Sequence, residues 1–149
     1  MEKTLFEERV SYFIQQRQNR KDTINAMLQM QLVSINSEEK KVVIKFTVST
    51  WELNPYQTLH GGIISAMADV AMGCVCYASS NAAATPTLQM SVSFIKAIKE
   101  GDEVLVEAIC DHAGSRIAQA RAFVSLIKDS SCYVNAHGSY AINLKQNKE

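Results

Sequence analysis

The sequence has no excess of charge of either sign, because 15 lysines and arginines balance 15 aspartates and glutamates over 149 residues. Proteins that bind nucleic acids need a basic surface that neutralises phosphates, so we expect no nucleic-acid partner. Glycine and proline are scarce, with six and two residues, while 47% of the residues are hydrophobic. This composition excludes a collagen-like or disordered chain. A chain of this length can bury about 70% of the surface it exposes when unfolded, so we predict one domain over residues 1–149.

Patterns that bind metals or form disulfide frameworks are also missing. The sequence has four cysteines but no Cys-x-x-Cys pair, and its three histidines lie far apart. We therefore expect no metal site and no structural disulfide, and interpret the cysteines as reduced thiols. The first eight residues lack the apolar stretch of a secretory signal, so the expected location is the cytoplasm.

Apolar periodicity predicts an N-terminal helix followed mostly by strands. Residues 1–25 form a predicted helical segment, with Thr4 as the N-cap of a helix that ends near residue 18. One face of this helix carries Phe6, Val10, Phe13 and Ile14. Period-two alternation predicts a hairpin and then four more strands, over residues 28–32, 41–48, 87–94, 104–110, 117–126 and 133–142. For residues 117–126 a helix is an alternative, because Ala, Gln and Arg favour helices, but the unbroken alternation favours a strand.

The segment over residues 60–79 predicts a long helix that is apolar on all sides. Such a helix is either buried or spans a membrane. Asp69 lies in its middle, and no Lys or Arg flanks either end closely, so we predict a buried helix and no membrane partner. The expected fold class is α+β, with a long central helix wrapped by an antiparallel sheet of about six strands and preceded by the N-terminal helix.

Asp69 and the start of the long helix are the candidates for chemistry. Asp69 is the only charged residue between Leu53 and Ile95, and a carboxylate in an apolar stretch is costly unless it has a partner or a function. Gly61 and Gly62 open the helix, where unpaired N–H groups and the positive end of the helix dipole favour an oxyanion. The competing interpretations are a buried acid satisfied by hydrogen bonds and a tight turn into the helix.

Two residues before the helix are further candidates. Asn54 offers a side-chain amide donor or serves as a turn residue. His60 either polarises a substrate or holds the loop by hydrogen bonds, and we favour the second role. Asp69 lies eight residues after Gly61, or about 12 Å along a helix, which is too far for both to act on one carbonyl. If both act together, two antiparallel copies of the helix must meet in a two-fold dimer.

The segment 54–62 with Asp69 resembles a known motif. It is similar to the pattern Asn-x-x-Gly-x-x-His-Gly-Gly-x6-Asp of hotdog-fold thioesterases, in the branch of the phenylacetate-degradation (PaaI-like) acyl-CoA thioesterases. The resemblance extends from about residue 25 to residue 142. Thr87 opens a strand where the family often has a hydroxyl, and residues 101–102 and 112–116 resemble its later turns.

The resemblance implies hydrolysis of a small or medium acyl- or aryl-CoA thioester to free acid and CoA, without a metal or redox cofactor. In this family the N–H at the position of Gly61 polarises the thioester carbonyl, helped by Asn54. The acid, here Asp69 of the partner chain, acts as general base or nucleophile, and Thr87 positions water. The resemblance also implies a homodimer or a dimer of dimers.

Other parts of the site follow less directly. Gly62, Thr87 and Arg116 are candidates for substrate binding, and Lys96, Lys99 and Arg116 are candidates for holding CoA phosphates. Three positions depart from the family pattern: Gln57 replaces its usual Gly, Ala97 replaces a common Pro, and Ser115 separates Gly114 from Arg116. Two alternative functions stay open, namely a non-catalytic acyl-CoA or ligand-binding module and a hotdog enoyl-CoA hydratase or dehydratase.

Overall fold

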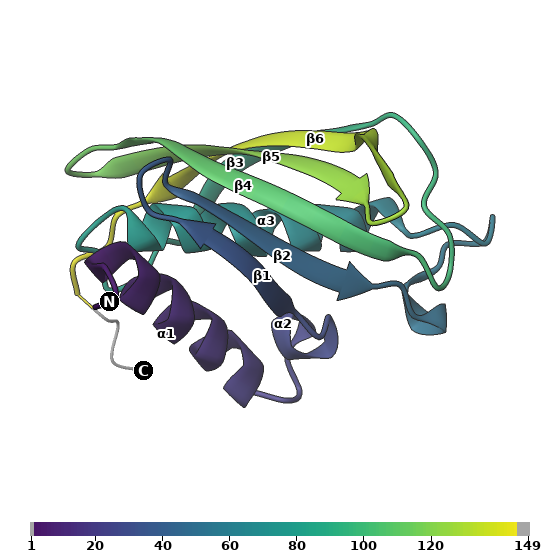
Figure 1. Cartoon of the computed structure of the whole chain (residues 1–149), viewed down its shortest axis with the longest axis horizontal. Helices are drawn as coiled ribbons and strands as arrows, with labels where there is room; N and C mark the ends of the chain where they lie inside the picture. The colour runs from purple at the N-terminus through teal and green to yellow at the C-terminus, as the bar shows by residue number, and fades with distance from the viewer. Residues whose placement is uncertain (1, 146–149) are drawn as a thin grey trace.

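The computed structural model describes residues 2–145 and shows a long helix packed along one side of a curved sheet (Figure 1). The helices are α1 (Leu5–Asn19), α2 (Ile24–Met27) and α3 (Gly61–Ala78), with a short 3-10 helix η1 (Thr50–Glu52). The strands are β1 (Gln31–Asn36), β2 (Lys41–Thr47), β3 (Thr87–Phe94), β4 (Glu103–Ala113), β5 (Ile117–Leu126) and β6 (Asp129–Ala141). The predicted α+β class and the number of strands are confirmed.

The six strands form one antiparallel sheet in the order β1-β2-β4-β5-β6-β3. β1 and β3 are therefore its two edges. Residues 117–126 form a strand, and the helical alternative for this segment is wrong. The alanines of β5 explain how the sheet approaches α3, because Ala118, Ala120 and Ala122 are buried on the face toward the helix and have no long side chains.

α1 begins where the sequence predicts. Thr4 is its N-cap, and a reciprocal pair of hydrogen bonds with Glu7 satisfies two backbone N–H groups at the helix start. The four apolar residues predicted for its inner face are buried. The ring of Phe13 lies 5.5 Å from that of Tyr77, so α1 covers a side of α3 that the sheet does not reach.

One predicted strand begins too early. Leu28 ends α2, where its backbone N–H bonds to Ile24 O, and Gln29 adopts a φ of 54°. Neither conformation continues a strand, and β1 starts only at Gln31. Leu28 and Met30 are both buried, so their spacing reflects contact with the core and not strand pairing.

α3 is long and apolar enough to cross a bilayer by length and composition, but twelve of its residues are buried inside the fold. This confirms the predicted buried helix. The first half of α3 keeps one uncovered face, where Gly62 is exposed and Ser65, Ala66 and Asp69 are half-buried. These residues follow helical spacing, so they form one stripe along α3.

Candidate active site

The loop before α3 is organised by Asn54. Its Oδ1 accepts hydrogen bonds from the backbone N–H groups of Tyr56 (3.0 Å) and Thr58 (3.1 Å), and its Nδ2 donates to Thr58 Oγ1 (2.8 Å). Backbone N–H groups only donate, so these bonds fix which end of the amide is oxygen. The second hydrogen of Nδ2 has no partner among residues 2–145. Asn54 therefore shapes the loop and also offers one free donor.

Gln57, at the position where the family usually has glycine, has a φ of 64°. This left-handed conformation favours glycine and costs other residues about 1–2 kcal/mol. Gln57 therefore adopts the backbone conformation that glycine favours at this position of the loop. Gln57 N–H also bonds to Asn54 O at 3.0 Å, which ties the turn to the same residue.

His60 caps the start of α3. Its Nδ1 accepts a hydrogen bond from Gly62 N–H at 2.9 Å, and a Cβ on Gly62 would lie 3.0 Å from that nitrogen. Ile63 and Ile64 donate their N–H groups to His60 O. The expectation that both glycines present free N–H groups is therefore wrong for Gly62. Of the two glycines, only Gly61 keeps an N–H group that is unpartnered within the described chain.

Asn54 and Gly61 line one cavity of about 270 Å³. The ring of Phe94, at the end of β3, forms part of its wall and would lie 3.2 Å from a Cβ on Gly61. Residues 95–98 form another part of the wall and include Ala97 and Lys96. Of the three cations considered for CoA phosphates, Lys96 is the one that lines this cavity.

Asp69 is held by two hydroxyl groups that donate to the same oxygen. Thr87 Oγ1 lies 2.7 Å and Tyr140 Oη 2.8 Å from Asp69 Oδ1. The two donors meet there because Thr87 in β3 pairs directly with Tyr140 in β6. Asp69 Oδ2 has no hydrogen-bond partner among residues 2–145. One carboxylate oxygen is thus fixed, and the other is available.

Tyr140 is a site residue that the sequence pattern does not reveal. It is only 1% exposed and fits the apolar alternation of β6, which is typical of a core residue. Burial raises its pKa, and the nearby Asp69 carboxylate adds to the effect, so the hydroxyl stays protonated and can donate. The signal that could have found it is that a buried tyrosine hydroxyl needs a hydrogen-bond partner.

The two halves of the candidate site lie in different cavities of one chain. Asp69, Thr87 and Tyr140 line a cavity of about 190 Å³ that shares no residue with the cavity of Asn54 and Gly61. The rise of α3 separates Gly61 from Asp69 by about 12 Å along the helix axis.

Arg116 lies apart from both cavities. It follows Gly114 in the β4–β5 turn, and its backbone oxygen accepts from Ile142 N–H at 2.8 Å. Gly114 shares a hollow with Ala78 and Ser79, at the C-terminal end of α3, whereas Gly61 lies at the other end of this 18-residue helix. At about 1.5 Å per residue, about 27 Å separate the two ends. The structure of one chain therefore does not bring Arg116 to Gly61.

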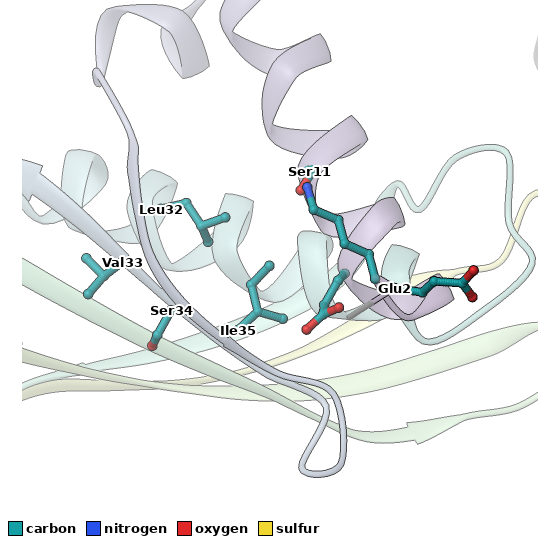
Figure 2. Close-up of a pocket in the computed structure, with 8 residues that line it drawn as sticks. Glu2, Ser11, Leu32, Val33, Ser34 and Ile35 are labelled. Carbon is teal, nitrogen blue, oxygen red and sulfur yellow. The ribbon is translucent and has the colours of Figure 1, made fainter.

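A further groove of about 510 Å³ lies between α1 and the edge strand β1 (Figure 2). Glu2, Ser11 and residues 32–35 line it. None of the candidate site residues faces this groove, and it lies on the opposite edge of the sheet from β3.

A long helix on a six-stranded antiparallel sheet, with an acid on the helix and a free amide at its start, defines the class of hotdog-fold proteins. Residues 56–133, more than half of the chain, match the family model of the thioesterase superfamily. The chain therefore belongs to the thioesterase superfamily, and the predicted family is confirmed.

Solved structures share the fold. A Streptococcus mutans protein bound to acetyl-CoA is 24% identical, with a TM-score of 0.71 over 80% of this chain and 92% of that chain. The PaaI protein of the Escherichia coli phenylacetic acid degradation operon is 19% identical, with a TM-score of 0.72 over 90% and 98%. Zebrafish thioesterase superfamily member 2 is 18% identical, with a TM-score of 0.78 over 90% and 98%. A search of curated protein sequences gives no match.

Proposed function

We propose that the protein is an acyl-CoA thioesterase that hydrolyses small or medium acyl- or aryl-CoA thioesters to free acid and CoA. The observation that carries this proposal is the arrangement of Asp69 on an uncovered face of α3. Two hydroxyls hold one of its carboxylate oxygens, and the other oxygen has no partner in the part of the chain that the structure describes. Membership of the thioesterase superfamily supports it. The acetyl-CoA bound to a Streptococcus mutans protein of the same fold agrees with a CoA thioester as substrate.

We further propose that each site is shared between two chains. β3 is an edge strand, and its residues Leu88 and Phe94 are 56% and 54% exposed, which leaves apolar surface and unpaired backbone groups open to a second copy. Two β3 edges pairing about a two-fold axis would place two α3 helices side by side and antiparallel. Asp69 of one chain would then face Gly61 and Asn54 of the other.

The start of α3 would stabilise the charge that develops on the thioester oxygen. Gly61 and Asn54 line one cavity, and each keeps an N–H donor without a partner among residues 2–145, so both would donate to a carbonyl oxygen bound there. These donors are fixed by the helix and by the Asn54 loop before the substrate arrives, so they need little reorganisation during the reaction. His60 would hold the helix start, and Lys96 would meet a CoA phosphate at the cavity mouth.

Asp69 would supply the chemistry on the other side of the carbonyl. As a general base, Oδ2 takes a proton from water, the hydroxide attacks the carbonyl carbon, and the CoA thiolate leaves and regains a proton from Asp69. As a nucleophile, Oδ2 attacks the carbonyl carbon and expels the CoA thiolate, which leaves an anhydride between Asp69 and the acyl group. Water then cleaves this anhydride to the free acid and the Asp69 carboxylate, and the released proton goes to the CoA thiolate. Thr87 and Tyr140 would keep Oδ2 aimed at the substrate in both routes, and neither route needs a metal or redox cofactor.

The test is a hydrolysis screen with short, long and aromatic acyl-CoA thioesters and a reagent that detects free CoA thiol. We expect thiol release by the wild-type protein and none by the nearly isosteric Asp69→Asn variant, which should still bind CoA thioesters. Removal of the Asn54 donor should cost about 2.7–4 kcal/mol of transition-state stabilisation. Binding without thiol release would instead indicate a ligand-binding module. Water addition to an enoyl-CoA without thiol release would indicate a hydratase.

A further inference from the structure

Arg17, in the last turn of α1, lines the same cavity as Asp69. It also lines an adjoining groove of about 490 Å³, which contains Lys145 and shares Thr85 and Pro86 with the cavity. Arg17 lies outside residues 56–133, so the family match gives no expectation for it. The N-terminal segment thus adds a guanidinium group to the surroundings of the proposed acid.

The guanidinium of Arg17 is held in place but has no counter-ion in the described part of the chain. It stacks on the ring of Phe13, 3.9 Å from the ring centroid. Among residues 2–145 it makes no hydrogen bond and no salt bridge. Partial burial lowers the pKa of Arg17, because the charged guanidinium loses part of its hydration. A partly desolvated, unpaired cation is unfavourable unless an anion binds to it.

The size and lining of the cavity point to the acyl end of a substrate. A volume of about 190 Å³ corresponds to about six water molecules at about 30 Å³ each, which is enough for a short acyl chain and too little for the nucleotide of CoA. Its wall contains one anion, Asp69, one cation, Arg17, and one side-chain amide, Asn25. An apolar acyl end would leave the guanidinium and the amide unpaired.

We propose that Arg17 binds a terminal carboxylate on the acyl group, so that the preferred substrates are CoA thioesters of short dicarboxylic acids. This inference rests on the proposed thioesterase function. The planar fork of a guanidinium matches the two oxygens of a carboxylate, and stacking on Phe13 orients that fork in advance. Asn25 can donate to the same carboxylate, and Lys145 in the adjoining groove adds positive charge that favours it. A CoA phosphate also carries anionic oxygens that could bind Arg17. The experiment distinguishes binding of this phosphate from binding of an acyl carboxylate.

The experiment measures binding of glutaryl-CoA and valeryl-CoA to the full chain carrying Asp69→Asn, by titration calorimetry. The two thioesters have five acyl carbons each and differ in the terminal carboxylate. We expect glutaryl-CoA to bind at least about 10-fold more tightly, because a hydrogen-bonded pair of charges is worth at least that factor. Arg17→Gln should abolish this preference, and Arg17→Lys should keep part of it. Arg20→Gln, which removes a charge at the exposed C-cap of the same helix, should leave it unchanged.

Two results would overturn the inference. One is a preference for valeryl-CoA, or none, in the chain with Arg17 intact. The other is an equal loss of affinity for both thioesters in Arg17→Gln, which would assign Arg17 to a CoA phosphate. Thiol release by the protein with Asp69 intact is measured separately on both thioesters. Its absence would refute the proposed thioesterase, while the binding preference would still decide whether Arg17 recognises a carboxylate.

Discussion

Removing the hydroxyl of Tyr140 tests whether the Asp69 carboxylate is positioned by the strands behind it. Tyr140→Phe deletes one of the two donors to Asp69 Oδ1, the one at 2.8 Å, and keeps the buried ring. A hydrogen bond to a charged group is worth about 1.5–3 kcal/mol. Thr87 still holds the same oxygen and Asp69 is partly solvated, so we expect the lower end, about 1.5 kcal/mol. That corresponds to about a 10-fold loss in kcat with little change in KM, and to a fall in Tm of about 3–6 °C.

Tyr133→Phe is the matched control, because Tyr133 lies on the same strand and donates to the Asp129 carboxylate, also at 2.8 Å. The assays are thiol release from the best substrate in the screen and thermal unfolding followed by circular dichroism. The control should lose stability but keep its kcat. A Tyr140→Phe protein with wild-type kcat and Tm would refute the positioning role. An equal loss of kcat in both variants would show that the effect is not local to Asp69.

Three other predictions concern stability and thiol reactivity. Burial raises the pKa of Glu52, whose Oε2 has no hydrogen-bond partner within residues 2–145. The Glu52 carboxyl therefore stays protonated to higher pH in the native state than in the unfolded state. The stability that this protonation contributes is lost as pH rises above about 4.3, the pKa of the unfolded state. Glu52→Gln should raise the unfolding free energy at pH 7 relative to wild type, with a gain that shrinks toward pH 4; a gain independent of pH would contradict this. Ala122→Leu should cost about 1–3 kcal/mol in urea denaturation, because Ala122 is fully buried on the face of β5 toward α3, whereas Ala113→Leu on the exposed end of β4 should cost little. The neighbouring Cys76 thiol is the main cause that lowers the pKa of Cys110, so Cys110 should react with iodoacetamide at lower pH than an ordinary thiol. Retention of that fast labelling in Cys110→Ser would show that another cysteine is responsible.

The elements that could be predicted from sequence are those whose local signals and burial agree. α3 was found because its apolar character, its glycine start and its length all indicate one buried helix. α1 was found from its Thr4 cap and its apolar face. The conformation around Leu28 is not predictable in this way. Leu28 and Met30 have the spacing of a strand, but the end of a short helix and the positive φ of Gln29 turn both side chains into the core.

The candidate site was predictable to the extent that its residues break a local pattern. Asp69 stands out as the one charge in a long uncharged stretch, and the two glycines stand out at a helix start. The sequence does not show which of the two glycines has a free N–H group. The His60 ring accepts the hydrogen bond of Gly62 N–H and leaves that of Gly61 free among the described residues, and this depends on the rotamer of His60. Tyr140 and Arg17 reach the cavity through strand pairing and helix packing between segments far apart in sequence, which periodicity cannot reveal.

The most direct test of the central claim is the activity of a dimer that carries Asp69→Asn on one chain and Asn54→Asp on the other. Asn54→Asp keeps the oxygen that accepts from Tyr56 and Thr58 N–H, but it lacks the Nδ2 donor. If the sites are shared, one of the two sites in this dimer combines both changes and the other is intact. The purified mixed dimer should then show about half the wild-type rate of thiol release, although the Asp69→Asn parent is inactive and the Asn54→Asp parent keeps about 1% of that rate or less. A mixed dimer as inactive as its parents would show that each site is built within one chain.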